Sequence, residues 1–261
     1  MLSRAFQFLQ ILSIDIVLGA VVLLHFFSTY FRVAPSIDIY FVLGASVWLI
    51  YTIDHLRDAV KAPNSTRIRY RFHHKYQRML QGSVLIVLIA IVCRLYFIDY
   101  RILMGGSVLA FLSGIYLLLQ KRLAGLALKE LYISLIYTAG ILLAPFVLGQ
   151  IFSFSVFLLL FLLSFSNLML FSRFEKEEDI RDGFLSIASV SESKRLESVI
   201  LICIALGLSI ALLSNQDLMT RYFVFAFVIY AILLFRANFL KKRNLYRLIG
   251  DGVFLFPVFF Q

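Results

Sequence analysis

Carboxylate side chains gather at two places in the chain, each at the end of an apolar segment. Asp54 and Asp58 are four residues apart, so both carboxylates lie on one face of a helix. The second group has the spacing 0, 3, 4, 7 and also follows one helical face, whereas Glu177 points elsewhere; its members are Glu175, Glu178, Asp179 and Asp182. Like charges that are held close together raise each other's pKa. We therefore expect a cation to lie between the two groups.

A hard divalent ion suits such carboxylate oxygens. Mg²⁺ in particular keeps few protein ligands and completes its shell with water and substrate phosphates. Several basic side chains follow the acids in the sequence and are suited to bind those phosphates: Arg67, Arg69, Arg71, Lys121 and Arg122. The pattern predicts a ligand with a diphosphate head and an apolar tail, held at the lip of an apolar cavity. In the alternative interpretation, these acids and arginines are solvated charges beside a membrane.

The elements that position these residues must lie in a lipid bilayer. The chain has 261 residues, 61% of them hydrophobic, and a mean hydropathy of +0.91. A water-soluble domain of this length has about half apolar residues, so much of this chain must face lipid. The net charge of +10 does not indicate nucleic-acid binding, because no soluble basic domain is present to do it. Cys93 and Cys203 lie in apolar stretches and are expected to be small buried hydrophobes.

A membrane-spanning helix needs about 20 mainly apolar residues, and nine suitable runs occur. They centre on residues 7–31, 37–57, 80–97, 102–119, 128–148, 152–173, 197–214, 220–237 and 246–260. The uncharged stretch from Leu131 to Ser172 would extend roughly 60 Å as one helix, about twice the bilayer core, so it must cross twice. Pro145 with Gly149-Gln150 is the expected turn. The sequence predicts an all-α bundle of nine transmembrane helices, with one membrane domain over residues 1–261.

The distribution of Lys and Arg predicts the orientation of this bundle. With the N-terminus inside, 21 of the 25 basic residues lie inside, and the outside loops hold only Arg32, Arg94, Arg101 and Arg221, as the positive-inside rule expects. Both acidic groups then face the cytoplasm, at the cytoplasmic membrane if the protein is bacterial. They are offset by 121 residues, from 54 to 175 and from 58 to 179. This offset indicates a repeat of helices 1–4 and 5–8, with a ninth helix added.

The second acidic group belongs to a longer motif. The segment from Glu175 to Ser186 reads acid-x-x-x-Asp-x-x-x-Gly-x-x-Ser. The Asp of this pattern is Asp179 and the Gly is Gly183. It resembles the second aspartate-rich motif of the UbiA superfamily of intramembrane prenyltransferases, in which an Asp stands where this chain has Glu175. The resemblance covers most of the chain, although only about ten positions carry it.

Two further features are similar to that family. The first motif of the family ends in Asp-x-x-x-Asp after helix 2, as Asp54 and Asp58 do here. Family members also carry a Tyr followed shortly by Lys-Arg after helix 4, similar to Tyr116 and Lys121-Arg122. Nine helices with both acidic motifs on the cytoplasmic side are the architecture of the family.

The resemblance implies a function and a set of site residues. It implies transfer of an isoprenyl group from a Mg²⁺-bound isoprenyl diphosphate to a lipophilic acceptor within the membrane, with an aromatic acceptor favoured. Catalysis and metal binding are assigned to Asp54, Asp58, Glu175 and Asp179, with Glu178 as a further candidate ligand. Diphosphate binding is assigned to Arg67, Arg69, Lys121, Arg122 and Tyr116.

The first motif departs from the family pattern. Family members have an Asn three to four residues before the first Asp, where this chain has Ile50 and Tyr51, so one metal ligand is missing. The Arg-Thr segment that normally follows is only loosely matched by residues 65–69. The alternative function is therefore a non-catalytic or transport-type membrane protein that binds a phosphate-bearing lipid.

The remaining ionisable residues receive structural interpretations. His73-His74 is expected to be a solvated pair in a basic loop. Asp15 and His25 lie within the first helix, and a neighbouring Tyr is a suitable partner for either. Arg247 and Asp251 are spaced i, i+4 in the last helix and are expected to pair with each other.

Overall fold

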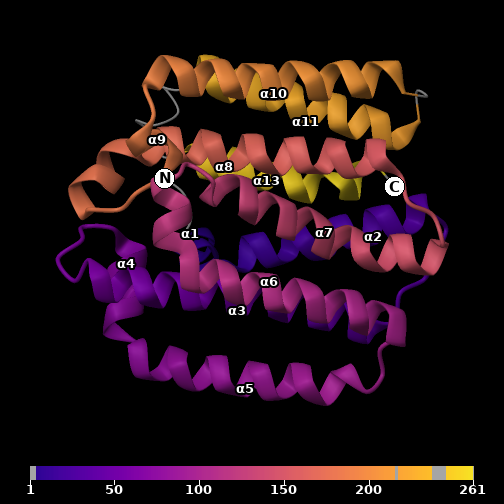
Figure 1. Ribbon diagram of the computed structural model, residues 1–261, viewed down its shortest axis with the longest axis horizontal. Helices are drawn as coiled ribbons and strands as arrows, with labels where there is room; N and C mark the ends of the chain where they lie inside the picture. Colours follow the sequence, from indigo (N-terminus) through magenta and orange to yellow (C-terminus); the bar gives the residue numbers. More distant parts are fainter. Residues whose placement is uncertain (1–3, 215–216, 237–244, 261) are drawn as a thin grey trace.

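The computed structural model describes residues 4–214, 217–236 and 245–260. The helices lie side by side along the long axis of the molecule (Figure 1). No strand occurs in the described ranges. Helices suit these apolar runs, because a helix satisfies its own backbone hydrogen bonds where water is absent.

The helices of the first half are α1 (Arg4–Ile11), α2 (Ile14–Tyr30), α3 (Ile37–Lys61), α4 (Ile68–Lys75), α5 (Gln77–Leu95) and α6 (Tyr100–Gly125). Those of the second half are α7 (Lys129–Gly149), α8 (Phe154–Asp182), α9 (Ile187–Val190), α10 (Ser193–Leu213), α11 (Leu218–Phe235) and α13 (Leu245–Gly252), and the 3₁₀ helix η1 (Val253–Phe260) ends the series.

Seven of these helices are long and apolar enough to cross a membrane: α3, α5, α6, α7, α8, α10 and α11. Many of their apolar side chains are exposed on the outside of the bundle, for example Ile86 at 69% and Phe111 at 69%. Such a surface is stable in lipid and unstable in water. The protein is therefore an all-α, multi-pass membrane protein.

The first and last predicted spans differ from simple long helices. Ser13 has a left-handed backbone conformation (φ 56°) and separates α1 from α2, so the apolar helix α2 has only 17 residues. At the other end, the eight residues of α13 continue directly as the 3₁₀ helix η1. The count of nine spans and the internal repeat therefore stay predictions.

The long uncharged stretch folds back as predicted. Helix α7 ends at Gly149, Gln150 takes a left-handed conformation (φ 50°), and α8 begins at Phe154. The role predicted for Pro145 in this turn is wrong, because Pro145 lies inside α7. The turn itself needs a residue with positive φ, which Gln150 supplies.

Helix α8 forms the centre of the larger core. It is the most buried of the seven spans and packs against α7, α10 and α11. Close packing of α10 on α11 depends on Gly207, since a Cβ there would meet the Phe227 ring at 2.2 Å. Helix α5 lies at the edge of the bundle and packs mainly on α3 (Figure 1).

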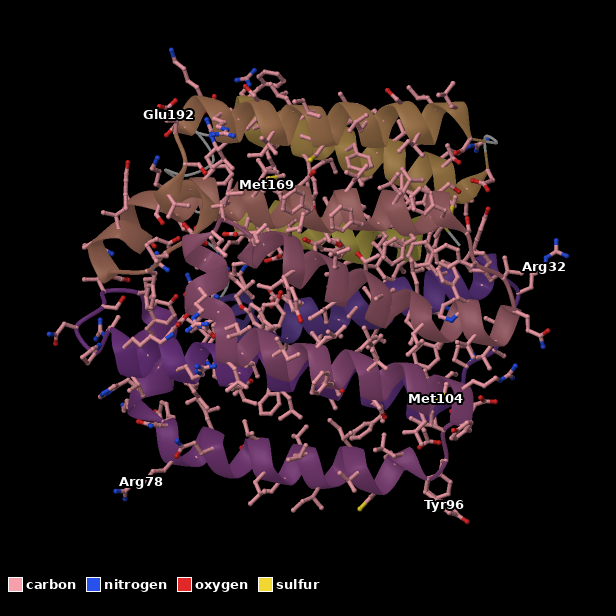
Figure 2. All side chains as sticks on the ribbon, in the orientation of Figure 1. Arg32, Arg78, Tyr96, Met104, Met169 and Glu192 are labelled. Carbon is pink, nitrogen blue, oxygen red and sulfur yellow. The ribbon has the colours of Figure 1, made fainter. Side chains whose placement is uncertain are left out.

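One end of the bundle collects the charged elements. Helix α3 leads into α4 there, and α8 leads into α9, at the left of Figure 1. Figure 2 shows many side-chain nitrogen atoms at this end, where Arg78 and Glu192 are labelled, and fewer around Arg32 at the opposite end. We call it the charged end. Both acidic groups lie at it, as predicted; which side of the membrane it faces stays a prediction.

Candidate functional site

The first acidic pair lies at the end of α3. The Asp58 carboxylate is buried (7% exposed), and its Oδ1 lies 3.3 Å from Nζ of Lys61. Asp54 is one helical turn earlier, and its buried Oδ1 has no hydrogen-bond partner among the described residues. Such a buried acceptor is costly unless something else binds it. Asp54 is therefore the member of this pair that is available to a ligand.

Lys129, the first residue of α7, is a functional candidate that sequence reasoning missed. It interacts electrostatically with Asp54, Asp58 and the Tyr116 hydroxyl. In the sequence it was only one of many basic residues in inside loops. Its position at a helix start beside the ends of α3 and α6 arises from packing. It makes the first acidic pair a mixed site, with two carboxylates and an ammonium group.

An apolar cavity of about 460 Å³ adjoins Asp54. It lies among α2, α3, α5, α6 and α7, and its volume is typical of a site for one small-molecule ligand. The lining residues of α3 run from Ile39 to Asp54, a length of roughly 22 Å at 1.5 Å per residue. Asp54 thus marks the end of the cavity nearest the charged end.

Few polar side chains interrupt the apolar wall of the cavity. Besides Asp54, the larger ones are the tyrosines Tyr51, Tyr116 and Tyr137. The hydroxyls of Tyr116 and Tyr137 are buried without hydrogen-bond partners in the described part of the chain. The cavity combines an apolar body with a polar head region, which fits a ligand built in the same way.

The second acidic group surrounds Arg67, which lies just before α4. The guanidinium nitrogens of Arg67 lie 2.7 Å from Asp179, 3.1 Å from Glu178, 3.4 Å from Asp182 and 3.8 Å from Glu175. The spacing 0, 3, 4, 7 therefore forms one face of α8, as predicted. Burial by itself would lower the pKa of Arg67. Tyr70 and the carboxylates raise this pKa by more than burial lowers it, so the guanidinium stays charged.

Glu175 has a second cationic partner from the far end of the chain. Its Oε1 accepts hydrogen bonds from the Arg247 guanidinium and, at 3.2 Å, from the Tyr246 hydroxyl. The ion pair predicted between Arg247 and Asp251 is not found among the described residues, where Arg247 pairs with Glu175 and Asp251 accepts a hydrogen bond from Asn167. Arg247 still interacts electrostatically with Asp251. The pairing with Glu175 crosses from α13 to α8, and local helical spacing does not reveal such contacts.

The Gly and Ser of the second motif end one helix and begin the next. Gly183 has φ 73°, a conformation that favours glycine, and its N–H together with that of Phe184 closes the end of α8 onto Ile180 and Asp179 carbonyls. Ser186 precedes α9, and its N–H donates to the Ser189 hydroxyl at 2.8 Å. These residues therefore end α8 directly after its acidic face and start α9.

The predicted diphosphate ligands lie in different environments. Arg69 donates from Nη1 to Nε2 of His55 at 2.9 Å, and burial lowers the pKa of Arg69. Arg122 is exposed at the end of α6. The side chain of Lys121 lies outside the described residues. Tyr116 lines the cavity.

Two aromatic residues of α4, Tyr70 and His73, are buried at the charged end. Burial raises the pKa of Tyr70 to about 12, and both Asp58 and Glu175 contribute to the rise, so Tyr70 is near both groups. His73 is buried (1% exposed), and its Nδ1–H donates to the Arg69 carbonyl oxygen at 2.9 Å. The prediction of a solvated histidine pair is therefore wrong for His73. His25, in contrast, has Tyr40 as a partner at 3.2 Å, a tyrosine as expected.

The two acidic groups differ in how well they suit a divalent ion. No set of three or more Asp, Glu, His or Cys side chains is close enough to hold a metal in the described ranges. Glu175 and Asp179 already pair with Arg67 and Arg247. Asp54 has a free buried oxygen. The first pair therefore keeps one carboxylate oxygen to which a Mg²⁺ ion could bind, whereas Glu175 and Asp179 of the second group are engaged in ion pairs with guanidinium groups.

Comparison of the chain with protein-family models, curated proteins and solved structures finds no significant match. Function is therefore inferred from the site itself. Its parts are a carboxylate pair at the head of an apolar cavity, an ammonium group beside it, and a second carboxylate face that is bridged by Arg67.

Proposed function

We propose that this chain transfers an isoprenyl group from an isoprenyl diphosphate to a lipophilic acceptor within the membrane. The observation that carries the proposal is Asp54, whose buried, unpartnered carboxylate oxygen lies at one end of the 460 Å³ apolar cavity. A diphosphate head at Asp54 and a hydrocarbon tail in the cavity would satisfy both features. The family resemblance of the two acidic motifs supports the same substrate.

The head region divides into a metal side and a phosphate side. Asp54 and Asp58 are the residues that would hold Mg²⁺, which supplies charge stabilisation to the departing diphosphate when bound. Lys129 is suited to bind the phosphate oxygens, since it already lies near both carboxylates. Glu175 and Asp179 belong to the same proposal, as the acids that hold Arg67 toward the head region.

The reaction needs a dry site that tolerates a positive charge. The C–O bond to the diphosphate breaks with both electrons on oxygen and leaves an allylic cation. The acceptor gives an electron pair to the new bond and loses a proton, which the diphosphate takes up. Tyr51, Tyr116 and Tyr137 line the cavity, and aromatic faces stabilise such a cation.

Titration of the purified protein with a fluorescent isoprenyl diphosphate tests the proposal. Saturable binding is expected with Mg²⁺ and much weaker binding with EDTA, because the diphosphate and the carboxylates repel each other without a metal. Incubation of the loaded protein with pooled membrane lipids and quinone precursors is expected to release diphosphate. Binding without release for any acceptor would contradict transfer and favour a carrier, and absence of binding would contradict the whole proposal.

The Gly106→Leu variant tests whether the cavity holds the tail. Gly106 lines the cavity, and a Cβ there meets open space, so the leucine side chain fills volume that the tail needs. Affinity for the isoprenyl diphosphate is expected to fall about tenfold, the equivalent of about two buried methylene groups. Competition by inorganic diphosphate measures the head region and is expected to stay unchanged.

Gly82→Leu is the matched control for this variant. Gly82 lies on α5, is exposed, and also has open space around its Cβ, but it does not line the cavity. The affinity of Gly82→Leu for the isoprenyl diphosphate is expected to equal that of the unmodified protein. Equal affinities of Gly106→Leu and Gly82→Leu for the isoprenyl diphosphate would place the tail outside the cavity.

A further inference from the structure

A second polar group lies in the interior, away from both acidic motifs. Its members are Asp15 on α2, Asn167 on α8 and Asp251 on α13, with exposed fractions of 6%, 5% and 6%. Helix α13 packs on both α2 and α8; Asn167 contacts Asp251, and Asp15 is near enough to interact electrostatically with Asp251. Asn167 follows the start of α8 by 13 residues, roughly 20 Å along the helix. The group is therefore well inside the bundle.

The oxygens of this group are only partly satisfied. Asn167 Nδ2 donates to Asp251 Oδ1 at 3.4 Å. Asp15 Oδ1, Asp251 Oδ2 and Asn167 Oδ1 are buried and have no hydrogen-bond partner within the described residues. Buried acceptors of this kind are costly. Three such oxygens together point to a positively charged ligand that is coordinated by oxygen atoms.

The nearby tyrosines do not supply the missing donors. Tyr230 donates its hydroxyl to the Gly250 carbonyl oxygen at 3.2 Å, and Tyr222 donates to the Val253 carbonyl oxygen at 3.4 Å. The Tyr137 hydroxyl, which is near enough to interact with Asp15 and Asp251, has no partner in the described structure. It can add a further oxygen to the group.

The charges around the group leave one negative charge unbalanced. Arg69 and Arg247 are the cations that act on both Asp15 and Asp251, and Asp15 also acts on Asp251 as a like charge. Arg247 is paired with Glu175. Arg67 also contacts Glu175, but it is shared with three further carboxylates of α8. Among the described residues, the three carboxylates of Asp15, Asp251 and Glu175 thus face two guanidinium groups that are not shared in this way. One positive charge restores neutrality, and a divalent ion would exceed it.

We propose that Asp15, Asn167 and Asp251 form a buried binding site for one monovalent alkali cation. Carboxylate and amide oxygens are hard ligands that suit such an ion. The site is separate from the cavity, because none of the three residues lines it. Tyr51 and Tyr137, which do line the cavity, interact with both Asp15 and Asp251 and so lie between the two sites. The proposal does not depend on the proposed transferase activity.

Thermal unfolding of the full chain in detergent, without Mg²⁺, tests this site. The midpoint is measured against increasing NaCl or KCl, with choline chloride keeping the ionic strength constant. We expect a saturable rise of about 3 °C or more with at least one of the two alkali salts, because an ion that binds only the folded state stabilises it. The Asp15→Asn and Asp251→Asn variants are expected to lose this rise.

Asp38→Asn is the matched control, since Asp38 pairs with the exposed Arg94 at the opposite end of the bundle; it is expected to keep the rise. Equal midpoints of the unmodified protein in NaCl, KCl and choline chloride would overturn the proposal, as would a rise that persists in Asp251→Asn. A site that is filled by a proton gives the first of these results. If the variants do not fold, ²²Na⁺ and ⁸⁶Rb⁺ binding to the unmodified protein decides, and absence of saturable binding of both overturns the proposal.

Discussion

The Asp54→Asn variant is expected to bind isoprenyl diphosphate about 10- to 100-fold more weakly in the presence of Mg²⁺, with little loss of stability. The substitution removes a charged metal ligand at the head of the cavity, and interactions with charged groups contribute about 1.5–3 kcal/mol each. The buried Asp54 Oδ1 has no partner in the described structure. The substitution therefore breaks no hydrogen bond of this oxygen, and Lys129 keeps Asp58 as a partner, so the thermal midpoint is expected to change little.

The control is Asp38→Asn, the same change on the same helix. Asp38 lies in the first turn of α3 and pairs with Arg94 at 3.1 Å. The affinity of Asp38→Asn for isoprenyl diphosphate is expected to be unchanged. Equal affinity of Asp54→Asn and the unmodified protein would remove Asp54 from the binding site. A large fall in the midpoint of Asp54→Asn would show that Asp54 has a structural partner instead.

The Arg67→Met variant is expected to be destabilised by about 3 kcal/mol. Arg67 is largely buried (side chain 12% exposed) and lies within 3.8 Å of four carboxylates of α8. Removing the cation from a buried ion-pair network leaves uncompensated charges, which typically costs about 3–5 kcal/mol. The expected fall in the thermal midpoint is about 6–12 °C for a chain of this size.

The acidic face of α8 becomes free in this variant, so added Mg²⁺ is expected to raise the midpoint of Arg67→Met more than that of the unmodified protein.

Arg71→Met is the control for this variant. Arg71 lies four residues after Arg67, on α4, and is exposed. The thermal midpoint of Arg71→Met is expected to change by less than about 1 °C. A midpoint of Arg67→Met equal to that of Arg71→Met would mean that the ion pairs contribute nothing to stability.

The seven long apolar helices and the acidic face of α8 were predictable from the sequence. The seven long apolar helices coincide with predicted spans, because hydropathy and length are local properties. The face of Glu175, Glu178, Asp179 and Asp182 is also local, since it depends only on 3.6 residues per turn. Arg67 contacts all four of them, as expected of one face.

The partners of the charged side chains were not predictable in the same way. Arg247 was expected to pair within its own helix, but it binds Glu175, 72 residues earlier. Lys129 was one of many loop cations, yet it is near enough to Asp54 and Asp58 to interact with both electrostatically. His73 was expected in solvent and is buried under α3, with its ring 5.2 Å from that of His55.

The carboxylates at the ends of α3 and α8 show which features follow from the sequence and which follow only from the tertiary structure. Their residue types, their spacing and the length of the helices that carry them follow from the sequence, because each depends on interactions within a few residues. The ion pairs of one group with Arg67 and Arg247, and the placement of Asp54 at a cavity, follow only from the tertiary structure. These contacts join residues that are distant along the chain, so their free energy depends on how the whole bundle packs.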